Sequence, residues 1–453
     1  MGDSQSVIRN VGCAVKNGMV LLPDGALRPG DVWIQDGRIQ EIGPSATDRE
    51  STSEQASYAG GGSVTLSSTT RHGTRTPCQA PHVSGGSVTV GPRGLRQVDA
   101  CGGYVLPGLI DLHTHGLHTE SAEAGSLIEY ARLEASHGTT TFYPTLFCSP
   151  EDSARSLERH RRETDELRSV PQVGGFRLEA PYLAIASGGS AEALSPVSPH
   201  TTRLLLQAGG GHVKTWDVSP ELPGAPELVQ QQAGEGIVCS IAHTQATIAQ
   251  ARAVVEAGAR LATHLFDVFY YTPERSDPDP DIYGPGLVDY LLVEDRVTCE
   301  IIGDGTHVSP LLVEKAFRCK PAGKLAFVTD SNYGAGLPPG RYALPGEWGN
   351  VFIDGPNSGV RLADRDMILA GSALTPLDGL RNVVRLFGKD VATASHVWSR
   401  NPARLMGLNK GEIAVGKDAD LIILDRDLNL LYTIVAGEVV YRGPDAESVI
   451  RES

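Results

Sequence analysis

Two histidines two positions apart follow an apolar run, and their spacing is one that can build a metal site. In the segment "LPGLIDLHTHG" (residues 106–116), His113 and His115 come at the end of the run. In an extended strand, residues i and i+2 point to the same face, so the two imidazoles would project side by side. The pair alone is weak evidence, because most histidines are solvated or hydrogen-bonded within a fold. A metal site therefore needs partners elsewhere in the chain.

Other side chains that can bind a metal or move a proton also follow apolar, strand-like runs. They are Glu179 in "FRLEAPYL", His243 in "GIVCSIAHT", His264 in "RLATHLF" and Asp330 in "LAFVTDS". A hydrolytic metal centre requires imidazole nitrogens, carboxylate oxygens and a base near the attacking water. We therefore expect the first three, with the two histidines above, to be metal ligands and Asp330 to be the catalytic base. Each also has a structural alternative, such as a strand-end acid, a helix cap or a turn former.

Alternating strand-like and helical segments from about Val105 to Met406 indicate how these residues are brought together. The segment "ATIAQARAVVEAGA" predicts a helix with apolar residues near one face and Gly258 as its C-cap, between two strand-like runs. This alternation favours a parallel sheet closed into a (β/α)8 TIM-like barrel. The C-terminal strand ends of such a barrel converge on one mouth, where its active site lies.

The two ends of the chain show short apolar runs separated by turn residues, which is typical of β structure. We expect residues 1–106 and 407–453 to pair into one small β-sandwich domain beside a hydrolase barrel at 107–406. Residues 44–94 are rich in Ser, Thr and Gly, and they predict a low-complexity surface insertion, partly disordered. Within it, "SVTV" (87–90) is a candidate strand.

Composition limits the classes of partner and compartment. The chain of 453 residues has a net charge of −15 and no dense Lys/Arg cluster, which argues against nucleic acid or an anionic membrane as the main partner. No apolar run approaches the roughly 18 residues of a membrane span, and the N-terminus lacks the apolar core of a secretory signal. We expect a cytoplasmic protein. Its 7 cysteines include no C-x-x-C pair, so any metal would be held by His and carboxylate.

A set of motifs in a fixed order carries a family resemblance. The chain resembles the amidohydrolase superfamily and, within it, the N-acetylglucosamine-6-phosphate deacetylases, over most of its length outside residues 44–94. The segments that resemble the family are "LPGLIDLHTHG", "FRLEAPYL", "HVKTWDVSPEL", "IAHTQATIAQARAVVEAGARLATHLF", "EIIGDGTHV", "VTDSNYGAGLPPGRY", "LAGSALTPLDGLRNVVRLFG", "NPARLMGL" and "GEIAVGKDADLIILD". The resemblance implies a distorted TIM barrel, a small β-sandwich from both chain ends, metal-dependent deacetylation in amino-sugar metabolism, and a homodimer.

The resemblance also implies a role for individual residues. Glu179, His243 and His264 match the principal metal ligands of the family, and Asp330 matches its catalytic aspartate. The pair His113 and His115 matches the H-x-H that binds an additional metal in those members that keep it, so one or two divalent ions are implied. Zinc is the default ion for such ligands. By the same resemblance, Arg275 and His307 are expected to contact the substrate phosphate.

Three departures from the family pattern lie on the substrate side. Ala180 stands where the family usually has glycine, and "AIASGGSAEALSP" lacks the histidine that the family presents to the substrate carbonyl. Asp267 stands where the family has an asparagine on the phosphate side, and a carboxylate there would repel a phosphate by on the order of 1 kcal/mol or more. Three readings therefore stay open. The first is an N-acetylglucosamine-6-phosphate deacetylase, which the sequence favours slightly. The second is an amide hydrolase that acts on a different N-acyl substrate, unphosphorylated or cationic. The third is a non-catalytic scaffold.

Overall fold

The largest part of the molecule is a barrel of parallel strands. The computed structural model describes residues 12–44, 88–90, 96–270, 284–343 and 349–446. Its 8-stranded sheet is parallel throughout and follows chain order. The strands are β7 (Leu109–Thr114), β10 (Thr139–Leu146), β11 (Phe176–Leu178), β12 (Val213–Val218), β13 (Val238–Ile241), β14 (Leu261–Ala262), β15 (Thr298–Ile302) and β16 (Leu325–Val328). A parallel bridge between Thr114 and Ser331 joins the first strand to the end of the last and closes the seam.

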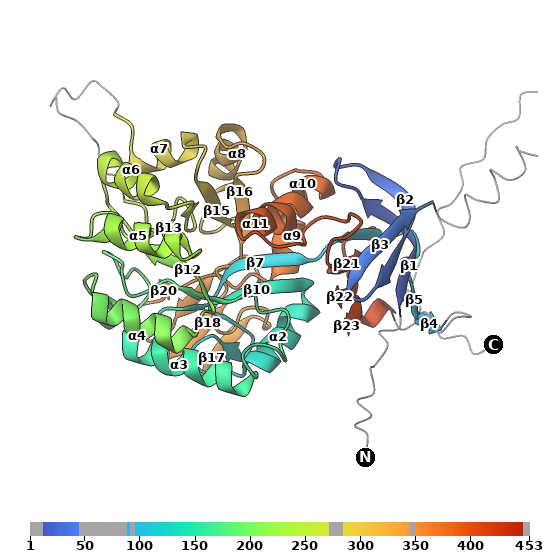
Figure 1. Cartoon of the computed structure of the whole chain (residues 1–453), viewed down its shortest axis with the longest axis horizontal. Helices are drawn as coiled ribbons and strands as arrows, with labels where there is room; N and C mark the ends of the chain where they lie inside the picture. The colour runs from blue at the N-terminus through green and yellow to red at the C-terminus, as the bar shows by residue number, and fades with distance from the viewer. Residues whose placement is uncertain (1–11, 45–87, 91–95, 271–283, 344–348, 447–453) are drawn as a thin grey trace, which may run out of the picture.

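Helices cover the outside of the barrel (Figure 1). They are α2 (Leu127–Ser136), α3 (Pro150–Glu163), α4 (Pro199–Gly209), α5 (Ala225–Gly234), α6 (Ile248–Ala257), α7 (Leu287–Val293), α8 (Pro310–Cys319), α9 (Pro376–Arg385), α10 (Val391–Ser395) and α11 (Asn401–Leu405). The helix predicted within residues 246–259 is α6. Its start is fixed by a capping box between Thr247 and Gln250, and Gly258 caps its end as expected.

The two chain ends form one small β domain beside the barrel (Figure 1). Its strands are β1 (Cys13–Leu21), β2 (Leu27–Gln35), β3 (Arg38–Gly43), β4 (Val88–Val90), β5 (Arg96–Asp99), β6 (Tyr104–Pro107), β21 (Leu421–Leu424), β22 (Leu430–Val435) and β23 (Glu438–Arg442). Strand β6 pairs with β1 on one side and with β21 on the other, so it joins the N-terminal to the C-terminal strands. The predicted fold class is confirmed, and the domain boundaries at 106 and 406 stay predictions. The candidate strand in the insertion is β4, and residues 45–87 lie outside the described residues.

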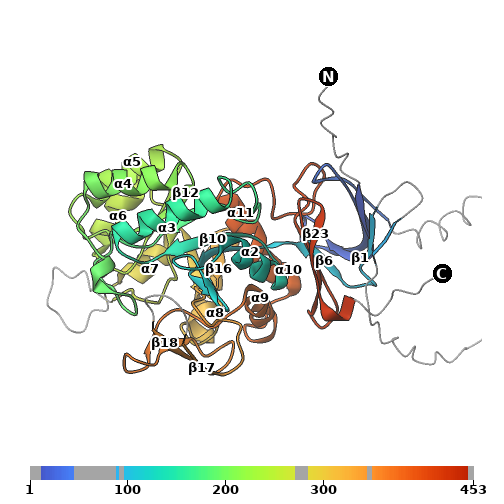
Figure 2. The same ribbon diagram turned by 90° about the horizontal axis from the view of Figure 1, so that it is seen from below.

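A small antiparallel sheet between β16 and α9 was not predicted from the sequence. Its strands are β17 (Gly340–Ala343), β18 (Asn350–Ile353), β19 (Val360–Leu362) and β20 (Ile368–Leu369). Figure 2 shows β17 and β18 as a separate layer beside the barrel. Buried Val351, Ile353, Val360 and Leu362 give this sheet a core of its own. The remaining strands, β8 (Gly116–Leu117) and β9 (Glu120–Ser121), form a short hairpin after β7.

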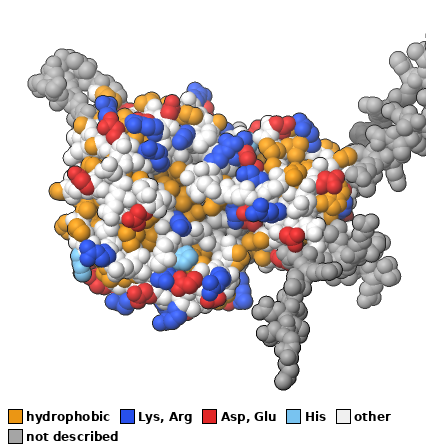
Figure 3. Space-filling model, viewed as in Figure 1, with side chains coloured by type: hydrophobic (Ala, Val, Ile, Leu, Met, Phe, Trp, Pro, Cys, Tyr) orange, Lys and Arg blue, Asp and Glu red, His pale blue; other side chains and the backbone are white. Residues whose placement is uncertain are grey.

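The surface carries both signs of charge. On the face seen in Figure 3, basic and acidic side chains are interspersed over the barrel and the small domain. Among the residues that the structure describes, no helix is both long and apolar enough to cross a membrane.

Candidate active site

All six residues predicted to bind metal or act as base lie at the C-terminal mouth of the barrel. His113 belongs to the end of β7, and the others follow the ends of their strands: His115 after β7, Glu179 after β11, His243 after β13, His264 after β14 and Asp330 after β16. Their exposed fractions lie between 0 and 6 %. The structure therefore brings together six groups that are spread over nearly half of the sequence, and their individual roles stay predictions.

Glu179 lies at the centre of the cluster, and each of its carboxylate oxygens faces two imidazoles. Its Oε2 is 3.0 Å from Nε2 of His115 and 3.3 Å from Nε2 of His113. Its Oε1 is 3.0 Å from Nε2 of His243 and 3.3 Å from Nε2 of His264. One carboxylate is thus shared between two pairs of histidines.

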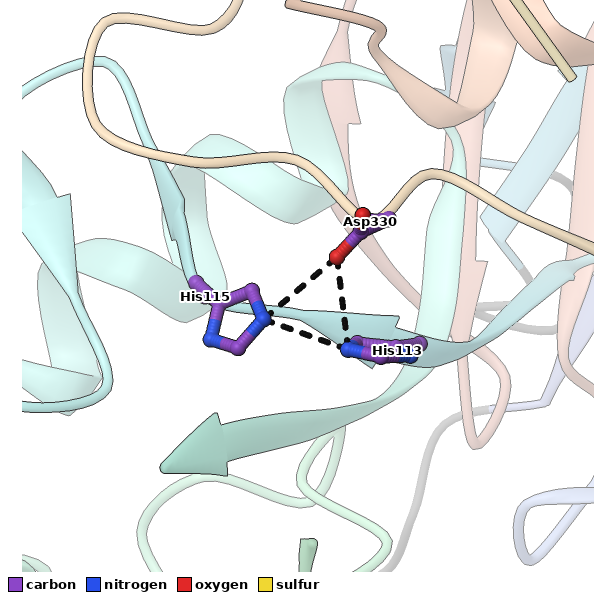
Figure 4. Close-up of side chains that lie close together, drawn as sticks. All are labelled: His113, His115 and Asp330. Atoms are coloured by element: carbon purple, nitrogen blue, oxygen red, sulfur yellow. Dashed lines mark hydrogen bonds and ion pairs between the residues drawn. The ribbon is translucent and has the colours of Figure 1, made fainter. Parts of the chain in front are cut away.

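Asp330 completes the group on the side of β7 (Figure 4). Its Oδ1 lies 3.3 Å from Nε2 of His113 and 3.4 Å from Nε2 of His115. The two Nε2 atoms are 3.2 Å apart, as the shared strand face predicted. Two triads, His113 with His115 and Asp330, and His113 with Glu179 and His264, each place their ligand atoms within 4.8 Å of one another.

The second ring nitrogen of three of the four imidazoles shows that this donor set fits a metal ion. These Nδ1 contacts are 3.1 Å from His115 to the carbonyl of Thr145, 2.8 Å from His243 to that of Ile185, 3.3 Å from His264 to that of Asp267, and 3.8 Å from His113 to Oε2 of Glu300. A carbonyl oxygen only accepts, so Nδ1 of His115, His243 and His264 donates, and the lone pair of each neutral imidazole is left on Nε2. The contact of His113 is too long for a hydrogen bond, and its Nδ1 has no hydrogen-bond partner among the described residues. All four Nε2 atoms point into the cluster, where a divalent ion would bind.

A pocket of about 100 Å³ opens above the cluster. Both substrate-side residues predicted within the described part of the chain, Asp267 and His307, line it, whereas Arg275 lies outside the described residues. The pocket is also lined by Phe147, by Gly188 and Gly189, and by residues 369–371 at the end of β20. These additional lining residues come from loops and from the small sheet. The sequence analysis did not predict that they line the pocket.

Comparison with known proteins places the chain in a family. Residues 104–440 match the sequence profile described as the Amidohydrolase family. The chain belongs to the amidohydrolase family. Among curated proteins it is 28% identical over 356 residues to an N-acetylglucosamine-6-phosphate deacetylase of Bacillus subtilis (strain 168). It is 31% identical over 361 residues to one of Homo sapiens. Each alignment covers 76% of this chain and 86% of the relative.

Solved amidohydrolase structures are similar over nearly the whole chain. An N-acetyl-D-glucosamine-6-phosphate deacetylase from Mycobacterium smegmatis superposes with a TM-score of 0.73 at 26% identity, covering 95% of this chain and 100% of that one. The corresponding enzyme from Thermotoga maritima gives a TM-score of 0.72 at 25% identity, with the same coverage. The barrel and small β domain described above are therefore the architecture of this amidohydrolase group.

The charges of the cluster favour protons on its imidazoles when no metal competes for them. Burial lowers the pKa of His115 and His264, but their carboxylate neighbours more than offset this and raise each pKa to about 10. Burial also raises the pKa of Asp330, yet the imidazoles of His113, His115 and His264 bring it well below its usual range. A divalent ion bound by these residues would displace protons, so its affinity would fall as the pH falls.

Three of the site residues have a backbone conformation that side-chain-bearing residues rarely adopt. The φ angles are +46° at His243, +27° at His264 and +49° at Asp330. Such a conformation costs about 1–3 kcal/mol for each residue and persists only where the surroundings fix it. The local sequence carries no signal for it, because none of the three is glycine.

Beneath the cluster, the barrel interior contains buried ion pairs that sequence reasoning missed. Arg177 on β11 donates to both carboxylate oxygens of Asp217 on β12, at 3.0 Å each, and to Glu300 on β15 at 2.7 Å. All three are 0 % exposed. Burial raises the pKa of Glu300, but Arg177 outweighs it and lowers that pKa to about 2. The available signal was the charged residue inside each apolar run, in "FRLEA", "TWDV" and "CEII".

His307 is also held by a residue that sequence reasoning missed. Asp304 accepts from Nδ1 of His307 at 2.6 Å and from the backbone N–H of Thr306 and His307. Burial lowers the pKa of His307, but Asp304 and the nearby carboxylate of Asp267 more than offset this and raise it. The signal was present in "GDGTH", where an aspartate three residues before the histidine forms a turn of this type.

Proposed function

We propose that this chain is a metal-dependent deacetylase that hydrolyses the N-acetyl amide of N-acetylglucosamine 6-phosphate to the free amine and acetate. The observation that carries the proposal is the cluster of four imidazoles around Glu179, beside Asp330, at the barrel mouth. Relatives named for this activity from Bos taurus and Homo sapiens are each 31% identical to the chain. This cluster argues against the non-catalytic scaffold, because burying four histidines around one carboxylate is costly and a scaffold gains nothing from it.

One or two divalent ions, with zinc as the default, are proposed at this site. Glu179, His243 and His264 would hold one ion, and His113 and His115 with a carboxylate oxygen of the cluster would hold a second. When bound, a divalent ion supplies a more acidic water and a polarised amide carbonyl. Since "AIASGGSAEALSP" lacks the histidine that the family presents to the carbonyl, polarisation of the carbonyl would fall to that ion or to another side chain.

Asp330 is proposed to carry the proton through the reaction. Its lowered pKa keeps the carboxylate ionised at neutral pH, so Oδ1 can take a proton from the attacking water. The water oxygen then bonds to the amide carbon, and the C–N bond breaks as Asp330 returns the proton to the leaving nitrogen. Acetate and a free amino group result. The burial of the cluster limits access of other water molecules to the reacting atoms.

The test is acetate release by purified, metal-analysed protein from N-acetylglucosamine 6-phosphate and, in parallel, from unphosphorylated N-acetylglucosamine. We expect acetate from both or from the phosphate alone, with the larger kcat/KM for the phosphate. No release from either sugar by protein with a full metal complement would contradict the proposal.

Asp267 supports a second candidate, an amide hydrolase for an unphosphorylated or cationic N-acyl substrate. Its side chain is 34% exposed, and its Oδ2 lies 3.9 Å from Nδ1 of His264, beside the pocket. A carboxylate at this place repels a phosphate group. We expect Asp267→Asn to raise kcat/KM for the sugar phosphate about 5- to 10-fold and to leave the unphosphorylated sugar unchanged. Asp267→Glu, which keeps the charge, is the matched control. Equal changes for both sugars would show that Asp267 does not select between them.

Partners and location follow from the same proposal. We propose a small-molecule N-acylated substrate, no nucleic-acid or membrane partner, a homodimer in solution and a cytoplasmic location. Light scattering after size-exclusion chromatography measures the oligomeric state. Cell fractionation measures the location.

A further inference from the structure

A segment outside the proposed ligand set contacts the backbone around Asp330 at several points. In "LAGSALT" (residues 369–375), Ser372 donates its N–H to the carbonyl of Asp330 at 2.7 Å and its Oγ–H to the carbonyl of Thr329 at 2.6 Å. Its own carbonyl accepts the N–H of Asn332 at 3.1 Å. Ser372 is 0 % exposed, so these bonds do not compete with bulk water.

Asp330 needs such support because of its backbone conformation. A φ of +49° is unfavourable for a residue with a side chain and requires fixing by the surroundings. On one side, the N–H of Asp330 donates to the carbonyl of His113 on β7 at 2.9 Å. On the other side, Ser372 binds the carbonyls of Thr329 and Asp330. The peptide of Asp330 is thus held between the strand that carries His113 and the segment that carries Ser372.

Gly371 allows this segment to approach so closely. Its φ is +68°, and a Cβ atom at this position would lie 2.7 Å from the carbonyl oxygen of Asp330. Any larger residue would push against the carbonyl that Ser372 binds. Glycine followed by serine is therefore the combination that permits the approach and makes the bonds.

We propose that Ser372 is a positioning residue that holds the carboxylate of Asp330 within reach of Nε2 of His113 and His115. The inference rests on the proposed function of Asp330 as the group that moves the proton. Ser372 does not touch the substrate or the reacting atoms. It acts through the backbone of residues 329–332. A substitution can remove its hydroxyl while the backbone bonds remain, and the same hydroxyl also accepts the N–H of Leu374 at 3.1 Å.

The kinetic test compares Ser372→Ala with Ser399→Ala. Ser399 is also 0 % exposed and donates its hydroxyl to a backbone carbonyl, that of Pro107 at 3.3 Å, so it is a matched control. We expect S372A to lower kcat about 10- to 100-fold, with KM within about twofold and metal content equal to wild type, because small misplacement of a reacting group is costly. S399A should leave kcat unchanged. Equal kcat values for the two variants would overturn the proposal.

A crystal structure of each metal-loaded protein supplies a readout that does not depend on turnover. In S372A we expect the Oδ1 of Asp330 to move away from Nε2 of His113 relative to wild type, and an unmoved carboxylate would overturn the proposal even if kcat fell. Ser372→Thr keeps the hydroxyl and should recover most of the lost kcat. If wild type releases no acetate from the sugar phosphate, the proposed function fails, and the carboxylate position in the two crystal structures still decides the role of Ser372.

Discussion

At the scale of single residues, Asp330 is the group whose removal should separate catalysis from metal binding. Asp330→Asn keeps the shape of the side chain but cannot accept a proton at neutral pH. We expect kcat to fall by about 10²- to 10⁴-fold, the usual contribution of a positioned acid or base. The metal content should stay near that of wild type, because four imidazoles and Glu179 remain. Turnover and elemental analysis of the same preparation measure both quantities.

Asp354 provides the control for this substitution. It lies at an exposed position at the end of β18, in the small sheet, and its backbone N–H is bonded to Ser358. Asp354→Asn should leave kcat and metal content unchanged. Turnover that survives in D330N at the wild-type rate would remove Asp330 from the mechanism, and loss of metal together with turnover would make it a ligand.

That these six residues lie together could be predicted, whereas the contacts that hold them could not. A histidine or an acid after an apolar run marks a strand end in any βα sequence, and a barrel brings those ends together. The left-handed backbone of Asp330 depends on Ser372, which lies 43 residues from Thr329, the residue whose carbonyl it binds. No local pattern reports a hydrogen bond across such a distance.

At the scale of elements, the buried ion pairs of Arg177 link strands that otherwise meet only through the sheet. Besides Asp217 and Glu300, Arg177 donates to the carbonyl of Leu112 at 3.0 Å and to Oγ1 of Thr263 at 2.8 Å. Arg177→Met would leave two buried carboxylates without a counter-charge. We expect the free energy of unfolding to fall by about 3–5 kcal/mol, measured by denaturant titration.

An exposed ion pair gives the control for this prediction. Arg168 pairs with Asp165, and their side chains are 71% and 72% exposed. Arg168→Met should leave the denaturation midpoint unchanged within error, since water replaces the lost partner. The double variant R177M/E300Q should be more stable than R177M alone, because one buried charge is neutralised. A midpoint for R177M equal to that of R168M would show that the network does not stabilise the barrel.

Among the elements, α6 was predictable and the small sheet was not. The apolar residues of α6 repeat with the helical period, and both ends of the helix carry capping residues. The periodic pattern and the capping residues therefore predict the same helix. Strands β17 to β20 are 2 to 4 residues long, which is too short for an alternating pattern to stand out. Their stability comes from pairing with one another and from a shared core, and both are non-local.

At the scale of the whole molecule, β6 is the element that makes one domain from two chain ends. It pairs in parallel with β1 and antiparallel with β21, and β7 of the barrel begins two residues after it ends. The strand and turn patterns at both ends predicted that they pair. The partner of each strand could not be predicted, because many registers bury the same apolar residues.

Global stability should depend on pH through His160 in the last turn of α3. This imidazole is 0 % exposed, donates from Nε2 to the carbonyl of Ala122 at 2.7 Å, and has no partner at Nδ1 among the described residues. Burial lowers its pKa from 6.5 to about 4. Between pH 6.5 and pH 4 this histidine is protonated in the unfolded chain but neutral in the folded protein, so acidification favours unfolding. The stability present above pH 6.5 is therefore lost as the pH falls towards 4.

The variant His160→Gln tests this prediction, because glutamine keeps a hydrogen-bond donor but does not titrate. The pH-dependent groups of the metal cluster are common to both proteins. From pH 7 to pH 5 we expect wild type to lose on the order of 2 kcal/mol more unfolding free energy than H160Q, measured by denaturant titration. The exposed variant His200→Gln should follow wild type, and an equal loss in H160Q would assign the acid sensitivity to other groups.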